Sequence, residues 1–328
     1  MRVPPSIVSA INHAAEIVIT THVIPDGDAI GSLLGLMHAL ESIGKRVTAA
    51  LSDPVPEYLA FLPGADRIQP AECTREGYEL AIVLDCGSPD RVGRCESAVA
   101  RSARVVNIDH HATNTQFANV NWVDSSAAAT AQLVLELVLD LGVELNAAIA
   151  TCLFAGLSTD TGSFRYSSTT SHTFNAAALL ADAGAKPWEI SQSIYDTKSY
   201  ASLAALSEAI LAMKFKCGGL LSSMDITREL MARYGVDESE TEGFISYARS
   251  VAGVEVAVAF KEVAPEIIRI GFRSKSRVDV ARVALDLGGG GHVRASGCTI
   301  EGSLEKAHAL VLSRLELALR EAGYSWTD

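Results

Sequence analysis

Acidic and imidazole side chains occur at four places in the sequence, in patterns suited to binding divalent cations. They are His22-Val-Ile-Pro-Asp26-Gly-Asp28, then Asp85, then Asp109-His110-His111, and finally Asp160 within Ser-Thr-Asp-Thr-Gly. Mixed imidazole and carboxylate ligands without cysteine suit Mn²⁺, and ligands grouped around a shared carboxylate are typical of two-metal hydrolases. The pattern therefore predicts a pair of cations and hydrolytic chemistry.

Plain structural roles compete with metal binding at two of these places. Asp28 precedes a helical pattern, where aspartate is a good N-cap, and Asp85 taken alone resembles a turn aspartate with a local hydrogen bond. The tripeptide at 109–111 differs, because burying an acid and two imidazoles at the end of a strand costs free energy unless a metal ion or hydrogen bonds satisfy them. The functional interpretation is favoured there.

Short β-branched runs that alternate with longer helical patterns predict the elements that carry these residues. We expect strands over 16–22, 46–51, 79–84 and 104–108, and helices over 29–44, 127–141, 146–158 and 171–183. The strands are continuously apolar, which indicates a parallel sheet covered on both faces and an α/β fold. Because the carboxyl ends of parallel strands meet at one edge of a sheet, the residues that follow the strands would share a pocket.

Beyond residue 203 the pattern changes, and 328 residues exceed what one hydrophobic core usually supports. We expect a catalytic domain over residues 1–195, a linker over 196–203 and a smaller α+β domain over 204–328. In the second domain the sequence predicts a hairpin over 213–225 that turns at Gly218-Gly219, a strand pair over 254–260 and 267–272, and a helix over 304–322.

Two segments of the second domain suit an anionic ligand. They are Arg273-Ser274-Lys275 and Gly289-Gly290-Gly291-His292-Val-Arg294. Consecutive glycines let main-chain N–H groups approach a phosphate or a nucleobase closely, and the histidine and arginines add charge. Glycines alone would indicate only a flexible loop. With His292 following them and a basic strand upstream, ligand binding is the favoured interpretation.

Charge and composition narrow the class of protein. A net charge of −12 disfavours long duplex nucleic acid as a partner, but it permits a small phosphorylated ligand held by metal ions. The six cysteines are scattered singly, which argues against disulfides and against a thiolate zinc site. The N-terminal segment lacks the apolar core of a signal peptide, and no apolar stretch reaches membrane-spanning length. We expect a soluble, cytoplasmic protein with no membrane partner.

Taken together, the motifs resemble the DHH phosphoesterase superfamily, and within it the oligoribonuclease/phosphoadenosine-phosphate phosphatases, or nanoRNases, which carry a C-terminal DHHA1 domain. The resemblance runs nearly end to end and rests on motifs in the family's order, at residues 22–32, 85–87, 90–93, 109–111, 158–162 and 289–292. The sequence departs from the family at residues 291–297, where Gly-His-Val-Arg-Ala-Ser-Gly replaces the more usual Gly-His-x-x-Ala-Ala-Gly. This departure bears on base preference rather than on phosphate chemistry.

The resemblance implies a role for each candidate residue. One Mn²⁺ would be held by His22, Asp26 and Asp85, and a second by Asp28, Asp85, His110 and Asp160, with Mg²⁺ or Co²⁺ as alternatives and Asp85 as the bridge. His111 would contact the scissile phosphate or protonate the leaving oxygen, and Asp109 would orient an imidazole. Substrate would be bound by Arg273, Ser274, Lys275, Gly289, Gly290, Gly291, His292 and Arg294.

The resemblance also implies an active site in the cleft between a parallel-sheet DHH domain and the DHHA1 domain, and a homodimer. The implied activity is Mn²⁺-dependent hydrolysis of short oligoribonucleotides to mononucleotides and of 3′-phosphoadenosine 5′-phosphate (pAp) to AMP. Three alternatives stay open: a phosphodiesterase acting on cyclic di-AMP or pApA, a family-II-like pyrophosphatase, and a noncatalytic nucleotide sensor. A RecJ-type exonuclease is disfavoured, because the sequence has no broad basic surface.

Overall fold

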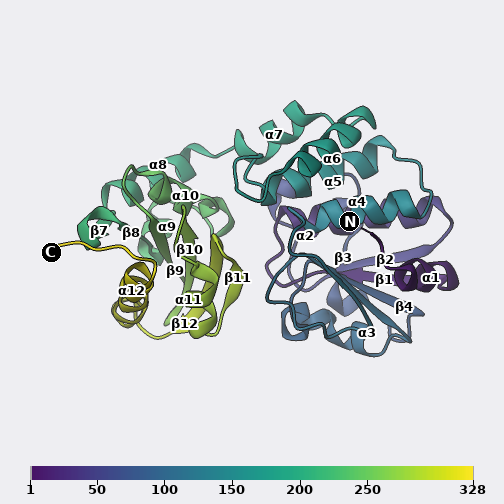
Figure 1. Cartoon of the computed structure of the whole chain (residues 1–328), viewed down its shortest axis with the longest axis horizontal. Helices are drawn as coiled ribbons and strands as arrows, with labels where there is room; N and C mark the ends of the chain where they lie inside the picture. Colours follow the sequence, from purple (N-terminus) through teal and green to yellow (C-terminus); the bar gives the residue numbers. More distant parts are fainter. Residues whose placement is uncertain (1, 328) are drawn as a thin grey trace. The chain divides into compact units, whose positions relative to one another are not determined.

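The computed structural model describes residues 2–327 and contains two compact units, one ending at Thr197 and the other beginning at Lys198 (Figure 1). The division falls inside the segment 196–203 that the sequence analysis assigns to a linker. The last part of that segment is helical, since helix α8 (Tyr200–Leu211) begins there. Ser199 caps the helix, because its hydroxyl oxygen accepts a hydrogen bond from the N–H of Ser202.

The first unit is built on a six-stranded parallel sheet, which confirms the predicted α/β class. The strand order is β3 (Gln69–Pro70), β2 (Arg46–Leu51), β1 (Glu16–Thr20), β4 (Leu80–Leu84), β5 (Val105–Asp109) and β6 (Val120–Val123). The chain adds strands on one side of β1, then crosses to β4 and adds strands on the other side. The switch point therefore lies between β1 and β4, where open α/β sheets form ligand sites.

The central strands are buried on both faces. In β4, Ile82 and Leu84 belong to the large core that contains the helices α2 and α5, whereas Ala81 and Val83 pack with Val92 and Val99 on the opposite face. This two-sided burial explains why the strands are continuously apolar in sequence. The two strands that the sequence analysis missed are β3, which has only two exposed residues, and β6, which is mostly half-buried.

Helices cover both faces of this sheet, and Figure 1 shows α3 on the side opposite to α4 and α5. The helices are α1 (Pro5–His13), α2 (Gly27–Ser42), α3 (Glu96–Ala100), α4 (Thr130–Asp140), α5 (Ala147–Asp160), α6 (Ser171–Asp182) and α7 (Pro187–Tyr195). A 3₁₀ segment, η4 (Pro89–Cys95), precedes α3. The predicted helices correspond to α2, α4, α5 and α6, and the sequence pattern does not predict α1, α3 or α7.

The second unit contains a mixed six-stranded sheet, which confirms the predicted α+β unit. Its order is β11 (Gly290–His292), β12 (Ala295–Glu301), β10 (Ile267–Ser274), β9 (Val256–Ala264), β8 (Leu221–Ile226) and β7 (Lys214–Lys216). Strands β8 and β9 are parallel and the other neighbours antiparallel. The hairpin predicted over 213–225 is confirmed as β7 and β8, and the predicted strand pair is confirmed as β9 and β10.

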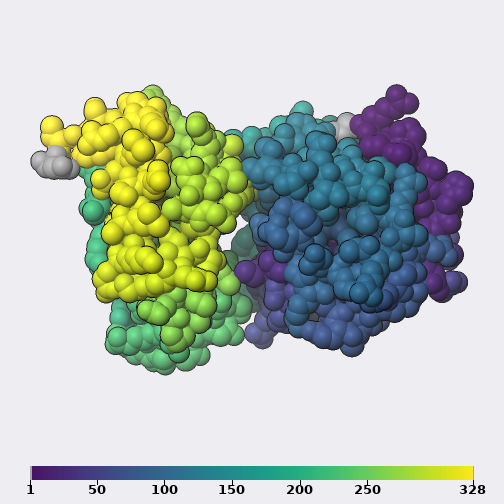
Figure 2. All heavy atoms as spheres, turned by 90° about the horizontal axis from the view of Figure 1, so that it is seen from below, coloured from purple at the N-terminus to yellow at the C-terminus, as the bar shows by residue number. Residues whose placement is uncertain are grey.

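Helices of the second unit pack on both faces of its sheet. One core lies with α11 (Val280–Asp286) and α12 (Leu304–Glu321), and the other with α8, α9 (Arg228–Tyr234) and α10 (Phe244–Ser250). In the space-filling view, the yellow surface formed by α12 and the segment after it covers much of one face of this unit (Figure 2). None of the helices within residues 2–327 combines the length and apolar character needed to cross a membrane.

The glycine run of the second unit is partly a strand, so a wholly flexible loop is the wrong interpretation. Gly290 pairs with Gly297 in the β11–β12 ladder. A Cβ on Gly289 would lie 2.1 Å from the carbonyl oxygen of Gly297, and Gly291 has a φ of +132°. Two of the glycines are therefore required by close backbone packing, whereas a Cβ on Gly290 would meet open space.

Helices α2 and α5 approach each other along a seam made of glycine. A Cβ on Gly31 of α2 would lie 2.4 Å from the carbonyl oxygen of Cys152 and 2.8 Å from the amide nitrogen of Gly156. A Cβ on Gly156 of α5 would lie 3.0 Å from a carboxylate oxygen of Asp28. The seam therefore leaves no room for side chains, and it holds the start of α2 close to the end of α5.

We expect Gly31→Ala to lower the free energy of unfolding by about 2–3 kcal/mol, because the new methyl group collides with backbone atoms that cannot rotate away. Gly35→Ala in the same helix is the matched control: its Cβ meets side-chain atoms of Leu153, which can change rotamer, and no backbone atom. Alanine also gains about 1 kcal/mol of helix propensity over glycine, so this control should stay near wild-type stability. Urea titrations followed by circular dichroism measure both changes, and equal losses would contradict the role of the seam.

Candidate metal centre

Residues that are distant in sequence meet at the carboxyl ends of β1, β4 and β5. His22 follows β1, Asp85 follows β4, and Asp109 ends β5. Three further acids come from helices or their caps, since Asp26 is the N-cap of α2, Asp28 lies in the first turn of α2 and Asp160 ends α5. The structure thus brings these side chains to the switch point of the sheet.

Two groups of potential ligands lie there on either side of Asp85. The first contains His22, Asp26 and Asp85, and the second contains Asp28, His110 and Asp160; within each group the ligand atoms lie within 4.8 Å of one another. A third group, made of Asp85, Asp109 and His111, overlaps the first through Asp85. Asp85 lies between the first two groups. Its Oδ2 is 3.5 Å from Nε2 of His22, and its Oδ1 is 3.5 Å from Nε2 of His110. A single carboxylate therefore presents one oxygen to each group.

His110 faces three carboxylates through one ring nitrogen. Its Nε2 is 3.5 Å from Asp160 Oδ2 and 3.7 Å from Asp28 Oδ2, in addition to its contact with Asp85. These separations exceed ordinary N–H···O hydrogen bonds and leave room for a cation. The other ring nitrogen, Nδ1, is 3.2 Å from the carbonyl oxygen of Ala127 and donates to it. This bond leaves Nε2 as the nitrogen that would bind metal.

Asp26, rather than Asp28, caps helix α2, so the N-cap interpretation of Asp28 is wrong. Oδ1 of Asp26 accepts the N–H groups of Asp28 and Ala29 at 3.0 and 3.1 Å. Asp28 instead supports another helix: it accepts the N–H groups of Thr130 and Ala131 at 2.6 and 2.8 Å. The first turn of α4 carries partial positive charge, which stabilises this buried carboxylate.

The backbone at Asp85 is bent, with a φ of +52°. This left-handed conformation is uncommon for residues other than glycine, although aspartate tolerates it better than most. The hydroxyl of Thr130 donates to Asp85 Oδ1 at 2.9 Å. Thr130 therefore contacts both Asp28 and Asp85, and the sequence analysis missed it. Its only sequence signal is its place near the start of the helix predicted over 127–141, which begins at Thr130 in the structure.

Without a cation, the carboxylates around His110 carry more negative charge than the nearby imidazoles can balance. Burial and the nearby Asp85 raise the pKa of Asp28 well above its usual range, and burial raises the pKa of Asp160 to about 6. Burial acts against the ionised form of Asp85, but the neighbouring imidazoles of His22, His111 and His110 lower its pKa overall. Burial also opposes a charged His110, yet the surrounding carboxylates raise its pKa to about 9. Such a donor set fits divalent cations, which would supply the missing charge.

His111 is held by a chain of hydrogen bonds that starts in the core. Its Nδ1 lies 2.7 Å from Oδ1 of the fully buried Asp109, and the Oδ2 of Asp109 accepts from Asn114 Nδ2 at 2.6 Å. Asp109 also accepts the N–H of His110 at 2.8 Å. These bonds fix the ring of the half-buried His111 beside the two groups of ligands. Asn114 is a second residue that the sequence analysis missed.

Cys86 lies next to Asp85 but is not a plausible ligand. Burial raises the pKa of its thiol to about 12. Metals bind the thiolate, so a thiol that stays protonated does not compete with the carboxylates.

The predicted substrate residues of the second unit are engaged with its backbone. Ser274 is buried and donates to the carbonyl oxygen of Val278 at 2.7 Å. The guanidinium of Arg294 donates to the carbonyl oxygens of Val278 and Ser276, the former at 2.9 Å. Lys275 Nζ donates to the carbonyl oxygen of Val251 at 2.6 Å. At least two of these side chains therefore hold the loop after β10 in place.

A buried carboxylate that the sequence analysis missed completes this loop. Glu255 accepts the N–H groups of Ser276, Arg277 and Val278 at 3.1, 2.7 and 3.0 Å, and the hydroxyl of Ser276 at 2.8 Å. Although burial opposes ionisation, these bonds lower the pKa of Glu255. The loop that carries Lys275 and Arg277 is thus fixed by its hydrogen bonds to the Glu255 carboxylate.

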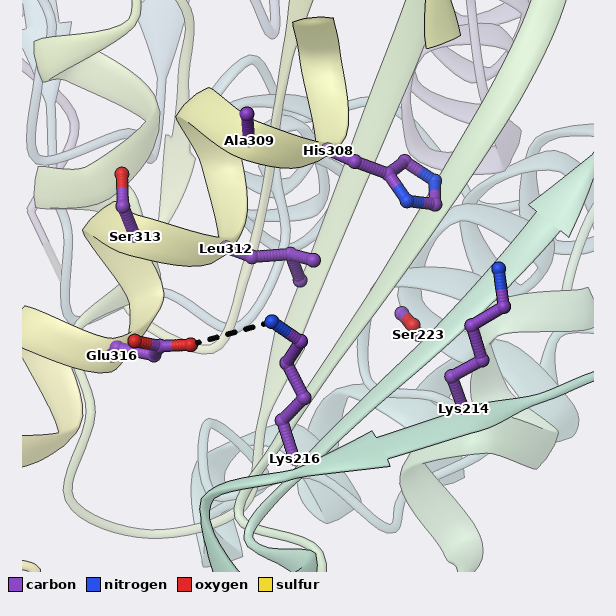
Figure 3. Close-up of a pocket in the computed structure, with 8 residues that line it drawn as sticks. All are labelled: Lys214, Lys216, Ser223, His308, Ala309, Leu312, Ser313 and Glu316. Carbon is purple, nitrogen blue, oxygen red and sulfur yellow. Dashed lines mark ion pairs between the residues drawn. The ribbon is translucent and has the colours of Figure 1, made fainter. Parts of the chain in front are cut away.

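A hollow of about 490 Å³ lies elsewhere on the second unit, between β7, β8 and α12 (Figure 3). Its lysines have acidic partners: Lys216 is 3.7 Å from Glu316, and Lys214 is 3.6 Å from Asp225, which also bonds His308 at 2.6 Å. In the strand order β7 is the edge strand opposite to β11. The hollow is therefore separate from the segments expected to bind substrate.

Comparison with known proteins agrees with both units. Residues 16–157 match the DHH family, N-terminal domain, and residues 225–321 match the DHHA1 domain. The bifunctional oligoribonuclease and PAP phosphatase NrnA of Thermus thermophilus is 38% identical over 99% of this chain and 96% of its own length. The protein of the same name from Bacillus subtilis is 30% identical over 87% of this chain and 89% of its own length. An exopolyphosphatase-related protein from Bacteroides fragilis has a crystal structure that matches 98% of this chain and 97% of its own, with a TM-score of 0.89 and 26% identity.

We expect Thr130→Val to destabilise the protein by about 1–3 kcal/mol, because the buried Asp85 loses a hydrogen bond that valine cannot replace. Thr130→Ser keeps the hydroxyl and should stay closer to wild type. Thermal unfolding of metal-free samples measures the difference. Equal stability of the valine and serine variants would show that the hydroxyl contributes nothing.

We expect the binding of a divalent cation at pH 7.5 to release protons, because His110 has a pKa of about 9 without metal and must lose the proton on Nε2. Affinity should therefore rise between pH 6.5 and 8.5, by up to about tenfold per pH unit for each proton displaced. Calorimetric titration with Mn²⁺ in two buffers of different ionisation enthalpy counts the protons. His110→Gln should release fewer, and a wild-type protein that releases none would contradict the assignment.

Proposed function

Because the chain belongs to the DHH/DHHA1 family of phosphoesterases, we propose that it hydrolyses short oligoribonucleotides to mononucleotides and converts pAp to AMP, with two Mn²⁺ ions as cofactors. The observation that carries the proposal is the position of Asp85, whose two oxygens face the two groups of ligands. The relatives from Thermus thermophilus and Bacillus subtilis, whose names state both activities, support the choice of substrates.

The ligand assignment follows the two groups. His22, Asp26 and Asp85 would hold one cation, and Asp28, Asp85, His110 and Asp160 the other. Two bound cations would supply a water nucleophile at neutral pH and neutralise charge on the phosphoryl oxygens. These donors also accommodate Mg²⁺ and Co²⁺. Mn²⁺ is proposed because the site combines carboxylates with imidazoles.

His111 would contact the scissile phosphate or donate a proton to the leaving oxygen. This role is supported by the hydrogen bond between Nδ1 of His111 and Asp109, which fixes the orientation of the ring. Asp109 is proposed to orient His111 rather than to bind a cation, because both of its oxygens already accept hydrogen bonds. Asn114 holds Asp109 in turn.

The second unit is proposed to bind the nucleotide. Arg273, Lys275 and His292 supply charge, Gly289, Gly290 and Gly291 supply close backbone approach, and Ser274 and Arg294 shape the loop that carries Lys275. Of the glycines, Gly290 has open space at its Cβ position, so it is the one best suited to let a ligand approach. Glu255 would contribute to nucleotide binding indirectly, by holding the same loop in place.

The test is release of AMP from pApA and of phosphate from pAp by metal-free protein supplied with Mn²⁺, Mg²⁺ or Co²⁺. We expect Mn²⁺ to give the highest turnover and Asp85→Asn to lower it more than about 100-fold, since even residues outside the ligand shell of a metal site cost 10- to 100-fold when removed. Asp140→Asn changes an exposed acid at the end of α4 and should remain active.

Cyclic di-AMP and pyrophosphate complete the substrate panel. Faster turnover of cyclic di-AMP than of pApA would favour a cyclic-dinucleotide phosphodiesterase, and preference for pyrophosphate would favour a pyrophosphatase. Nucleotide binding without turnover of any of these compounds would replace the proposed enzyme with a sensor.

A further inference from the structure

Arg91 places a guanidinium group beside the candidate metal centre. It lies in η4, shortly after Asp85, and its Nη2 is 3.3 Å from Nδ1 of His22. Its carbonyl oxygen accepts the N–H of Val23 at 2.7 Å, which ties η4 to the segment that carries His22 and Asp26. The residue is half-buried.

The contact between Arg91 and His22 is not a hydrogen bond. Nδ1 of His22 lies 2.7 Å from the carbonyl oxygen of Val23. A carbonyl oxygen can only accept, so Nδ1 carries the hydrogen and cannot accept another from the guanidinium. The Arg91 side chain is therefore held next to a ligand ring without bonding to it.

Arg91 has no acidic partner in the described chain, and it is half-buried, whereas the other first-unit arginines without an ion pair, Arg2, Arg104 and Arg165, are exposed. Ion pairs with glutamate are formed by Arg46, Arg67, Arg75, Arg94 and Arg101. Arg94, three residues further along η4, pairs with Glu72. Across residues 2–327 no carboxylate lies within ion-pair distance of Arg91. Its guanidinium is therefore not engaged in an ion pair within the described residues, although the acids of the candidate metal centre lie nearby.

The backbone conformation at Gly93 helps to fix the position of Arg91. Gly93 has a φ of +62° and a ψ of −137°, which breaks the regularity of η4. A Cβ on Gly93 would lie 2.5 Å from both Ser52 Oγ and Val23 Cγ1. Only glycine allows η4 to turn this close to the segment of His22, so the position of Arg91 is fixed by local geometry.

A guanidinium beside a cation site is unfavourable in isolation, because like charges repel and the repulsion weakens metal binding. An anion bound between the cations and the guanidinium is attracted to both, so it turns this repulsion into a net attraction. Phosphoryl oxygens have this charge, and the planar guanidinium matches their geometry. An arginine at this place that is not held in an ion pair is thus suited to bind the phosphoryl group of the substrate.

We propose that Arg91 is a catalytic residue that donates hydrogen bonds to a nonbridging oxygen of the phosphoryl group under attack and stabilises the negative charge that develops there. The inference rests on the proposed function only in requiring a phosphoester as substrate. It requires no particular nucleotide, and Arg91 takes no part in bond making or proton transfer.

The test compares Arg91→Gln and Arg91→Lys with the matched control Arg94→Gln, which removes an arginine from the same segment. Three quantities are measured: turnover of pApA and pAp, affinity for Mn²⁺ alone, and affinity of the Mn²⁺-loaded protein for orthophosphate. We expect Arg91→Gln to lower kcat/KM by about 10- to 100-fold and to weaken orthophosphate binding. Affinity for Mn²⁺ should stay the same or rise, because a neighbouring positive charge is gone.

Arg91→Lys should keep more activity than Arg91→Gln, and Arg94→Gln should remain within about twofold of wild type in all three measurements. Added guanidinium chloride should restore part of the turnover of Arg91→Ala. Unchanged turnover and orthophosphate affinity in Arg91→Gln would overturn the proposal, and so would a parallel loss of Mn²⁺ affinity, which would mean that Arg91 only positions His22. If wild-type protein hydrolyses neither nucleotide, the proposed function fails, while the orthophosphate measurement still decides the role of Arg91.

Discussion

Crowding of carboxylates around a single imidazole is the constraint on which the first unit depends. Asp85, Asp160 and Asp28 all lie 3.5–3.7 Å from Nε2 of His110, in a place with little water. Charges of one sign repel strongly there, and the fold offsets part of the repulsion with oriented N–H and O–H groups. Helix α4 donates two backbone N–H groups to Asp28 and the Thr130 hydroxyl to Asp85. The start of α4 and the course of β4 are therefore tied to the same group of acids.

Much of this arrangement could be predicted because its parts are chemically distinctive. His22, Asp85 and the tripeptide at 109–111 each follow an apolar run, and parallel strands bring such residues together whatever the loops do. Asp160 could also be predicted, because it follows the helix expected over 146–158; in the structure that helix continues to Asp160 itself. The resemblance to a known family added the division into two groups of ligands, which spacing alone did not provide.

The residues that escaped prediction act through ordinary groups. Thr130 contributes a hydroxyl and a backbone N–H, Ala127 a carbonyl oxygen, and Asn114 an amide that bonds a residue five positions away. Whether Asp26 or Asp28 caps α2 depends on backbone angles that neither side chain dictates. In the second unit, the basic side chains suggest ligand contacts in sequence, yet Arg294 bonds carbonyl oxygens and Glu255 organises the loop. Such choices depend on tertiary contacts rather than residue type.

The glycine seam between α2 and α5 has a consequence for the kind of ion that the first unit can accept. Asp28 and Asp160 sit on these two helices, and the helices touch through backbone atoms that no change of rotamer can move. The spacing of the two carboxylates is therefore as stiff as the helices themselves. Ca²⁺ needs longer bonds and more oxygens than Mg²⁺ does, and with the helices fixed only rotation of the carboxylate side chains could make room for it. Discrimination by ionic radius would then originate in residues that never contact the ion.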